Sequence, residues 1–363
     1  MVGPARAGYD RPLCEHKFVR WDNLKVEGEG EGRAKLPGFR DPAVVRTFDA
    51  PEALDTRFYE IRARSAINEV PKKSRMPFRY TINPYRGCSH ACLYCFARPT
   101  HTYLDFNARE DFEREIVVKV NVPELVRAEL GRPSWKGEHV ALGTNTDPYQ
   151  WVEGRYRLME GIWEAMRDHA NPCSVLTKSP LLLRDVGLLK EISERTEFAA
   201  NLSIPTLDEK AWRATEPHTP HPRKRIEAVA ELTRAGIKTG VLIAPLIPGV
   251  NDSPEQLAPL LEGVREAGAD SIGGVGLHLR GEVREIWFDW LREHRPDLIP
   301  RYEELYARGA YMPTNERDRL SALIGPRRGG GRLRASRNTG HAPPKDSASQ
   351  GSGSKPAEQP SLF

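Results

Sequence analysis

The feature that most constrains the fold is a regular alternation of short apolar runs and amphipathic segments, which begins near residue 78 and continues to residue 281. Each apolar run is rich in β-branched residues and is bounded by polar residues, Gly or Pro, as expected of a buried strand. The six runs are "FRYTINP", "HVALGTN", "CSVLTKS", "EFAANLSIP", "KTGVLIAPLIP" and "DSIGGVGLHL". Alternating strands and helices favour parallel strands joined by right-handed crossovers. We therefore expect an α/β fold, a partial (βα)6 TIM-type barrel, with a doubly wound sheet as the alternative.

Segments with apolar residues at helical spacing separate these runs. They cover residues 109–130, 156–170, 180–196, 222–236 and 253–268. Two further amphipathic helices are expected within residues 282–309, where they would close one side of the barrel. In a barrel of this type, residues at the carboxyl ends of the strands face the active site.

The pattern divides the chain into four regions. Residues 1–75 are expected to form an irregular N-terminal extension with one short strand or turn in "RFYEIRARSAINEVP", because "VEGEGEGRAKLPG" is too polar and Gly-rich for a regular element. Residues 76–281 form the core, and residues 282–326 the helices that pack on it. Residues 327–363 are rich in Gly, Ser and Pro and are expected to be a disordered basic tail.

The charge of the chain is concentrated in that tail. Residues 327–363 carry seven basic and two acidic residues, a net charge of +5. Because the formal charge of the whole chain is +4, the remaining residues have a net charge of about −1. A basic arm can add non-specific affinity for nucleic-acid phosphates. Its ordinary role, however, is to keep a chain solvated, and we favour that reading.

The sequence indicates a protein of the cytoplasm with no membrane partner. No run of about eighteen apolar residues is present, and "MVGPARAGYDRPLCEHK" lacks the apolar segment of a secretory signal. In a reducing compartment, clustered cysteines bind metal or do chemistry more often than they form disulfides. The isolated Cys14 and Cys173 are expected to be an incidental thiol and a small buried residue.

Three cysteines, Cys88, Cys92 and Cys95, lie within eight residues directly after the first expected strand. That position is a loop at the catalytic face of a barrel. Iron–sulfur clusters are usually held by four cysteine thiolates, so three would leave one iron open to a substrate or cofactor. The alternative is a structural zinc site completed by His90 or His101. On the residues alone, iron–sulfur is the favoured reading.

A family resemblance bears on this choice. The stretch "GCSHACLYC" resembles the C-x-x-x-C-x-x-C signature of the radical S-adenosylmethionine (SAM) superfamily, with the aromatic Tyr94 just before the last cysteine. The stretches "INPYRGC", "YCFARPTH", "GTNTDPYQ", "LTKS", "LSIPTLDE" and "PLIPGVNDS" are similar to its spore photoproduct lyase-like branch, also called DNA repair photolyase-like. The similarity runs from about Ala66 to Leu279, and "YLDF" and "RPSW" resemble an uncharacterised actinobacterial subgroup.

The resemblance implies a lyase-like radical SAM enzyme with two cofactors. Cys88, Cys92 and Cys95 would ligate a [4Fe-4S] cluster, and SAM would chelate its fourth iron. Reductive cleavage of SAM would yield a 5′-deoxyadenosyl radical that abstracts a hydrogen from the substrate. The family also implies a flavodoxin or ferredoxin-type electron donor.

The resemblance further implies which residues contact SAM. Thr146 and Asp147, after the second strand, would meet its amino group, and Lys178, after the third, would pair with its carboxylate. On the residues alone, Asp147 before Pro148 builds a turn equally well, and a solvated position is the usual fate of a lysine.

The remaining SAM contacts would come from later strands and from the cysteine loop. Ser203 ends the fourth strand and aligns with a serine that contacts SAM in the family, although a hydroxyl there can instead satisfy the backbone. Ile243 and Pro245 would pack on the adenine from the fifth strand, with ordinary core packing as the alternative. Tyr94 would form part of the wall around the cofactor.

The chain departs from spore photoproduct lyase itself at one position. That enzyme returns a hydrogen through a cysteine near the end of its second strand, where this chain has Thr144 as the nearest residue. Cys173 would lie at the opposite end of the barrel. The resemblance therefore carries the cofactor chemistry, while the catalytic residues stay unassigned and nucleic acid is only a candidate substrate. A zinc-stabilised nucleic-acid-binding module is the alternative function.

Overall fold

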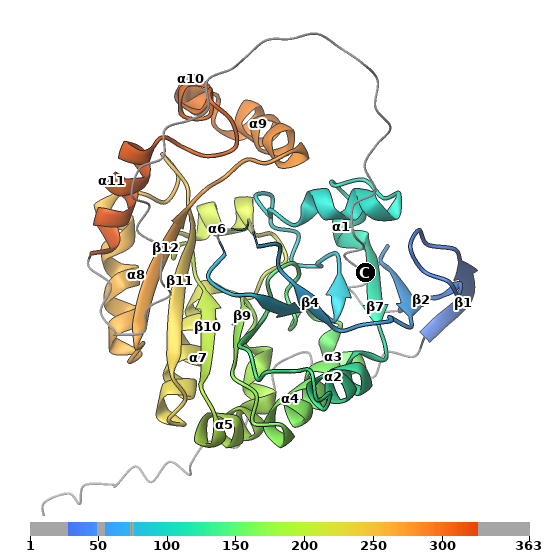
Figure 1. The fold of residues 1–363 in the computed structure, drawn as a ribbon. Coiled ribbons are helices and arrows are strands. Elements are labelled where there is room, and N and C mark those ends of the chain that lie inside the picture. The colour runs from blue at the N-terminus through green and yellow to red at the C-terminus, as the bar shows by residue number, and fades with distance from the viewer. Residues whose placement is uncertain (1–27, 49–54, 73, 75, 326–363) are drawn as a thin grey trace, which may run out of the picture.

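A seven-stranded sheet forms the centre of the molecule (Figure 1). The computed structural model describes residues 28–48, 55–72, 74 and 76–325. The strand order is β12-β11-β10-β9-β8-β5-β4, so β12 and β4 (Ile67–Glu69) are the two edges of an open sheet. Only β4 runs antiparallel to its neighbour. The six parallel strands are β5 (Tyr80–Ile82), β8 (Val140–Leu142), β9 (Cys173–Thr177), β10 (Phe198–Ser203), β11 (Thr239–Leu246) and β12 (Ser271–Gly276).

Each of the six expected runs contains one of these parallel strands, which confirms the α/β class and the repeating strand–helix pattern. The main crossover helices are α4 (Leu158–Asp168), α5 (Val186–Arg195), α7 (Pro222–Arg234) and α8 (Pro254–Glu266). The short elements α3 (Glu153–Tyr156), η2 (Pro180–Asp185) and α6 (Glu209–Thr215) lie in the connections. Ser253 caps α8 by accepting a hydrogen bond from the Gln256 amide, which explains why the helix begins at Pro254.

The two faces of the parallel sheet differ in composition because side chains alternate along each strand. One face packs into the main hydrophobic core, and its residues are Val140, Leu142, Cys173, Val175, Ala200, Leu202, Val241 and Ile243. The opposite, inner face carries mainly small or polar residues with three apolar ones, and most of the set are partly exposed: Ala141, Ser174, Leu176, Asn201, Ser203, Gly240, Leu242, Ser271, Gly273 and Val275. The inner face is therefore less tightly covered than the face that packs into the core.

A second, five-stranded sheet lies beside the first in the order β1-β2-β3-β7-β6 (Figure 1). Its strands are β1 (Gly28–Ala34), β2 (Ala43–Phe48), β3 (Arg57–Ile61), β7 (Glu115–Lys119) and β6 (Tyr85–Arg86). The expectation that "VEGEGEGRAKLPG" forms no regular element is wrong, because β1 pairs with β2 from Gly28 to Ala34, with one irregularity between Glu29 and Glu31. Backbone pairing with a neighbouring strand outweighs the low β-propensity of its glycines.

The helix expected over residues 109–130 is also wrong as a single element. It is divided into α1 (Asp111–Arg114), strand β7 and α2 (Val122–Leu130). Residues 115–118 of β7 are all buried, and a fully buried apolar run cannot be assigned to helix or strand from its periodicity. Because β6 pairs with β7, this second sheet holds the segment that leads into the cysteine loop.

The two helices expected within residues 282–309 are present as α9 (Glu282–His294) and α10 (Ile299–Leu305), joined by η3 (Pro296–Leu298). They lie beyond the end of the sheet near α6 (Figure 1), and α9 contacts η1 (Arg98–Leu104). A further helix, α11 (Thr314–Ile324), packs on β12 and was not expected. The basic tail of residues 327–363 and Cys14 lie outside the described residues.

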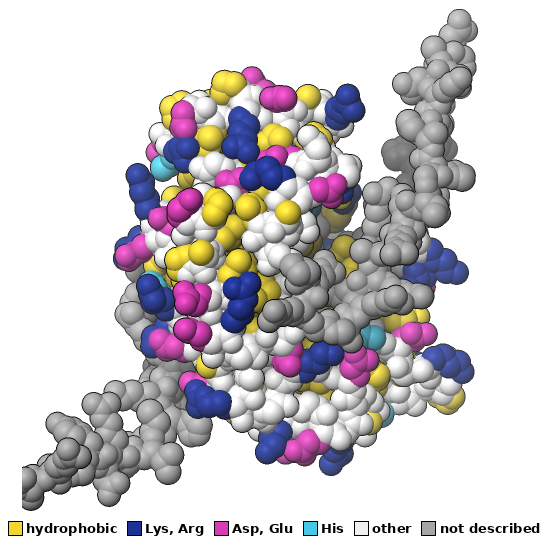
Figure 2. Space-filling model, turned by 90° about the vertical axis from the view of Figure 1, so that its left-hand side faces the viewer, with side chains coloured by type: hydrophobic (Ala, Val, Ile, Leu, Met, Phe, Trp, Pro, Cys, Tyr) yellow, Lys and Arg dark blue, Asp and Glu magenta, His cyan; other side chains and the backbone are white. Residues whose placement is uncertain are grey.

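Charges of both signs are interspersed on the face of the molecule that carries α8 and α11, with hydrophobic side chains gathered between them (Figure 2). That face therefore has no single-sign field of the kind that attracts nucleic acid over a wide area. Within the described residues, no helix combines the length and the apolar character that crossing a membrane requires.

Candidate cluster and cofactor site

The cysteine loop, residues 87–97, follows β6 directly and lies near the carboxyl edge of the parallel sheet. Its entry is fixed by Gly87, which has φ of +79°; a Cβ there would lie 2.8 Å from the carbonyl oxygen of Phe112. The Cys88 amide donates to that same carbonyl at 2.9 Å. Only glycine fits this close approach, so the first ligand position depends on the residue before it.

A buried arginine, Arg98, stabilises the loop through hydrogen bonds to its backbone. Its guanidinium, which is 2% exposed, donates to four backbone carbonyls and pairs with Glu113 at 3.1 Å. The four acceptors are the carbonyls of Ala91, Cys92, Ala108 and Arg109. The rigid fork of arginine suits such multiple donation, whereas a lysine would supply a single point charge. Arg98 therefore fixes the backbone at Cys92, and sequence analysis missed it.

The three thiols lie in a poorly solvated setting. Cys88 and Cys92 are buried and Cys95 is partly buried, and none is in a disulfide. Burial raises the pKa of all three, that of Cys92 to about 12. Thiolates become favourable there only beside a cation. The donor chemistry and the surroundings fit an iron–sulfur cluster.

The described residues hold no group of three or more His, Cys, Asp or Glu placed to bind a single metal ion. A [4Fe-4S] cluster does not require such a group, because each of its cysteine ligands binds a different iron.

The two histidines that could complete a zinc site have other neighbours. His90 Nδ1 lies 3.2 Å from Asp147 Oδ2. His101 is buried, stacks on Phe106 with ring centroids 5.2 Å apart and meets Phe112 edge-on at 5.6 Å. Burial lowers the pKa of His101 to about 4. Neither ring forms, with the cysteines, a group placed to bind a single metal ion within the described part of the chain, so the zinc alternative gains no support from them.

The "GTNTDPYQ" motif after β8 forms hydrogen bonds with the start of the cysteine loop. Thr146 Oγ1 donates to the Gly87 carbonyl at 2.7 Å, and the Ser89 amide donates to Gln150 Oε1 at 2.9 Å. Gln150 Nε2 donates in turn to Thr146 Oγ1 at 3.3 Å. Thr146 thus supports the loop through its hydroxyl, and Gln150 is a second residue that sequence analysis missed. The assignment of Thr146 to the SAM amino group stays a prediction.

The carboxylate of Asp147 connects β8, β9 and the cysteine loop. Oδ1 accepts from the Thr177 hydroxyl at 2.6 Å and the Tyr149 amide at 2.9 Å, while Oδ2 accepts from the Lys178 amide at 2.7 Å and faces His90. Burial alone would raise the pKa of Asp147, but His90 and these donors lower it. Both oxygens are therefore already occupied, as in the turn-building role, and its contact with SAM stays a prediction.

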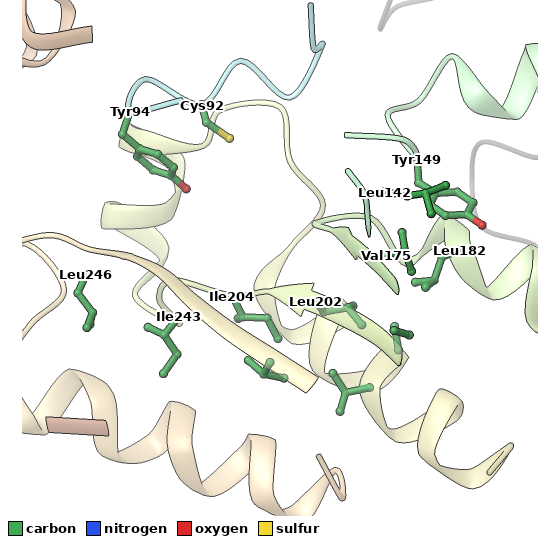
Figure 3. Close-up of a cluster of buried hydrophobic side chains, with 14 of the residues drawn as sticks. Cys92, Tyr94, Leu142, Tyr149, Val175, Leu182, Leu202, Ile204, Ile243 and Leu246 are labelled. Carbon is green, nitrogen blue, oxygen red and sulfur yellow. The ribbon is translucent and has the colours of Figure 1, made fainter. Parts of the chain in front are cut away.

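Lys178, Ser203 and Tyr94 converge on one buried acid, Glu216, at the end of α6. Lys178 Nζ lies 2.7 Å from Glu216 Oε1 and donates to Ser203 Oγ at 2.8 Å. The Tyr94 hydroxyl donates to Glu216 Oε1, and Lys178 Nζ lies 5.6 Å from the centre of the Tyr94 ring. Figure 3 shows the Tyr94 ring extending from the loop that carries Cys92. Three of the predicted SAM contacts thus form one network.

Arg225 of α7 completes this network. Its guanidinium lies 2.7 Å from Glu216 Oε2 and donates to the Ser203 carbonyl at 3.0 Å. Burial alone would raise the pKa of Glu216, but Arg225 and Lys178 lower it to about 2. The ionised carboxylate is therefore stable, and it fixes Lys178 at the inner face of the sheet.

The apolar candidates on β11 lie in the core. Ile243 is fully buried among the main core residues, on the side of the sheet that carries a helix in Figure 3. Its partner in register is Gly274, where an added Cβ would meet Ile324 of α11. Pro245 is also buried and follows a cis peptide bond. The partly exposed Leu242 has the opposite orientation, toward the inner face.

Two positions outside the cofactor site were also placed by sequence analysis. Thr144 follows β8 at the carboxyl edge, with its hydroxyl oxygen 3.3 Å from Asn83 Nδ2. Cys173 is buried and begins β9, which confirms that it lies at the opposite edge of the sheet from the cysteine loop.

Four supporting residues, Arg98, Gln150, Glu216 and Arg225, were not predicted. Arg98 and Gln150 lie within stretches that had been singled out, "YCFARPTH" and "GTNTDPYQ", but neither had been given a role. Glu216 and Arg225 lie outside every such stretch, and buried charges in loops and helices give no periodic signal by which to find them.

Comparison with protein-family models identifies the radical SAM superfamily over residues 82–261. An uncharacterised protein of Mycobacterium tuberculosis is 44% identical over 310 residues, which are 85% of this chain and 91% of that protein. A radical SAM Nα-GlyT isomerase of Pseudomonas phage M6 is 25% identical over 234 residues, 63% of this chain and 45% of the phage protein.

Among solved structures, a spore photoproduct lyase variant aligns with a TM-score of 0.54 at 16% identity, covering 76% of this chain and 81% of the lyase. Another variant of that enzyme, with bound AdoMet and dinucleoside spore photoproduct, aligns with a TM-score of 0.53 at 16% identity, over 74% and 77% of the two chains. At this identity the likeness establishes a shared fold.

Proposed function

The chain belongs to the radical SAM superfamily, and from that premise we propose that it binds a [4Fe-4S] cluster through Cys88, Cys92 and Cys95. SAM bound to this cluster supplies, on reduction, a 5′-deoxyadenosyl radical that abstracts a hydrogen from the substrate. Membership of the superfamily makes the chain an enzyme that uses SAM and an iron–sulfur centre. The cluster type, the reductive cleavage and the residue roles are our proposal.

The observation that carries the proposal is the position of the cysteine loop above the inner face of the sheet. The three thiols lie on a loop held by Arg98, Gly87 and Thr146. Tyr94 of that loop is linked through Glu216 to Lys178 and Ser203 at the inner face. Because the ligand side chains are already held in place, little conformational entropy is lost when the cofactors bind. Such prior positioning is how a protein orients a reactive group.

Within this site we assign the binding of SAM to the residues on or near the inner face. Lys178 pairs with the SAM carboxylate, and Ser203 contacts SAM beside it. Tyr94 contributes to the wall around the cofactor. Lys178 Nζ lies within 3 Å of Ser203 and Glu216, so the SAM carboxylate would join or replace Glu216 as its anionic partner.

Further SAM contacts are proposed from β8 and β11. Thr146 and Asp147 lie at the end of β8 and meet the SAM amino group, in addition to their bonds to the loop and to β9. Ile243 and Pro245 contribute the apolar wall toward the adenine from β11. Leu242, which faces the inner side, is the structural candidate to share that role.

We propose that the electron reaches the cluster from a flavodoxin or ferredoxin-type protein in the cytoplasm. Nucleic acid is the proposed substrate class, supported by the fold shared with a lyase whose structure holds a dinucleoside photoproduct. We propose residues 76–281 as the radical SAM core, residues 1–75 as an N-terminal extension, residues 282–326 as helices that pack on the core and residues 327–363 as a tail.

Metal analysis of protein purified without oxygen tests the cluster. We expect about four irons and four sulfides per chain, and zinc in their place would support the alternative of a zinc-stabilised nucleic-acid-binding module. Cys95→Ala should lose most of the iron. Cys173→Ala is the matched control, because it removes a buried thiol at the far edge of the sheet and should keep the iron. Retention of iron by Cys95→Ala would contradict the ligand assignment.

A further inference from the structure

Three aromatic rings form a continuous row beside the last cysteine. The Phe96 ring, directly after Cys95, lies with its centroid 5.8 Å from that of His278, at an interplanar angle of 31°. His278 stacks on Tyr311 at 5.4 Å and 9°. A β-bridge joins the backbones of His278 and Tyr311. The row, which we call the ring platform, therefore has its geometry fixed by two backbone segments.

The outer rings of the platform face solvent. Phe96 is 47% exposed and Tyr311 is 64% exposed, although burying large aromatic rings is ordinarily favourable. Burial and the nearby Arg280 lower the pKa of His278, so its ring is neutral and can stack at neutral pH. Arg280 itself is exposed beside the platform and has no carboxylate partner among the described residues.

The platform belongs to the catalytic side of the molecule. His278 follows β12 at the carboxyl edge of the sheet, and Phe96 is adjacent to a proposed cluster ligand. Just beyond His278, a Cβ added at Gly281 would lie 3.5 Å from Pro99 of η1, so the segment after β12 packs against the element that follows the cysteine loop. The platform and the cysteine loop therefore lie on the same side of the molecule.

We propose that the ring platform binds a nucleobase of a single-stranded nucleic-acid substrate. This inference rests on the proposed function and specifies its substrate. A base stacks on the exposed face of Phe96 or Tyr311, and Arg280 lies beside them to meet the backbone phosphate. Aromatic side chains with a neighbouring cation are the usual way in which proteins hold unpaired bases.

The exposure of the rings favours a polymer over a free nucleotide. Small-molecule sites enclose most of their ligand, whereas two outer rings about half exposed or more offer an open surface. A paired duplex does not present its base faces, so it is disfavoured.

Binding of a fluorescein-labelled single-stranded DNA 12-mer to the reconstituted full chain, measured by fluorescence anisotropy, tests this proposal. Phe96→Ala and Tyr311→Ala should each weaken binding roughly 5- to 100-fold, the range found for loss of one base stack. Phe96→Trp and Tyr311→Trp should bind the oligonucleotide about as tightly as the wild type, because tryptophan also stacks on a base. A merely structural role of these rings would not predict that a larger ring preserves binding. Tyr103→Ala, which removes a tyrosine that is 51% exposed on η1, is the control and should bind like the wild type.

Three results would overturn the proposal: no binding by the wild type, equal binding by the alanine variants, or competition by a free mononucleotide as strong as by the 12-mer. Formation of 5′-deoxyadenosine by the same wild-type preparation separates this failure from a failure of the proposed function. A protein that cleaves SAM but does not bind the oligonucleotide leaves the radical SAM assignment intact and refutes only the platform.

Discussion

Glu216 shows how a single buried acid can organise a cofactor site. It is 1% exposed, yet its carboxylate contacts Lys178, Arg225 and Tyr94, which come from β9, α7 and the cysteine loop. Burying a carboxylate is costly unless its charge and its lone pairs are satisfied, and here two cations and a phenol satisfy them. The position of Lys178 at the inner face thus depends on an acid 38 positions later in the chain.

Replacing this acid tests its role. Glu216→Gln keeps the shape of the side chain but leaves Arg225 buried without its ion pair, so we expect the free energy of unfolding to fall by about 3–5 kcal/mol. Urea denaturation monitored by circular dichroism measures it. Glu209→Gln is the matched control, because Glu209 pairs with Arg213 on the exposed face of the same helix, and it should have no measurable effect. Equal stability of both variants would contradict the account.

At the residue scale, the sequence pointed to side chains that lie within family motifs, but not to the buried side chains that fix their positions. The resemblance placed Tyr94, Lys178 and Ser203, and the structure brings these three together. Glu216 and Arg225 were not predicted, because an ion pair between segments distant in the sequence depends on the three-dimensional packing. Asp147 was noticed, but its four donors could be identified only once β8 and β9 were adjacent.

Gly143 sets the geometry at the end of β8. Its φ is +80°, and an added Cβ would lie 2.0 Å from the carbonyl oxygen of Leu176 in β9. No real Cβ approaches a backbone oxygen so closely, so the chain can leave β8 toward the "TNTDPYQ" segment only through a glycine.

A pair of glycine substitutions isolates this effect. Gly143→Ala should lower the free energy of unfolding by about 3 kcal/mol or more, because it combines left-handed strain of about 1–2 kcal/mol with a backbone clash. Gly137→Ala has similar strain, at φ of +68°, but nothing lies within 4 Å of the added Cβ, so it should cost only the strain. Thermal or urea unfolding measures the stability of both variants. Equal decreases in the free energy of unfolding would contradict the prediction, because they would mean that the backbone clash at Gly143 adds no destabilisation.

At the element scale, the sequence predicted the parallel strands well and the second sheet poorly. The six strands have strong signals because each is apolar, β-branched and bounded by turn residues. Strand β7 gave no such signal because its buried run sits between charged helical segments. Strand β1 is stabilised by pairing with β2, a contact with no local signature in "GEGEGRA".

The acid response of the whole molecule should contain a contribution from Glu216. Its folded pKa of about 2 lies below the ordinary 4.5, so its stabilising effect is complete above about pH 4.5 and is lost as the pH falls toward 2. The difference in unfolding free energy between wild type and Glu216→Gln should therefore shrink by about 2 kcal/mol between pH 6 and pH 3.

Denaturant titrations at several pH values measure this difference. The comparison cancels the other titrating groups, such as Glu153, whose burial raises its pKa to about 7. A difference that stays constant down to pH 3 would contradict the low pKa of Glu216.

At the scale of the whole molecule, the fold class followed from the sequence because one repeating unit accounts for most of the core. The division into four regions stays a prediction, and the tail that carries the excess charge lies outside the described residues. The six-stranded parallel array and the second sheet both support the cysteine loop, since β6 anchors its start beside β7 and Thr146 holds it from the end of β8.

The central claim is that this chain cleaves SAM at a cluster held by three cysteines. The most direct measurement is the yield of 5′-deoxyadenosine from anaerobically reconstituted protein after reduction with dithionite, followed by liquid chromatography. The account predicts 5′-deoxyadenosine and methionine from the wild type and at least a 100-fold lower rate from the Cys88→Ala/Cys92→Ala/Cys95→Ala variant, roughly the loss expected when a catalytic cofactor is removed. A wild-type protein that contains the cluster but forms no more 5′-deoxyadenosine than this variant would contradict it.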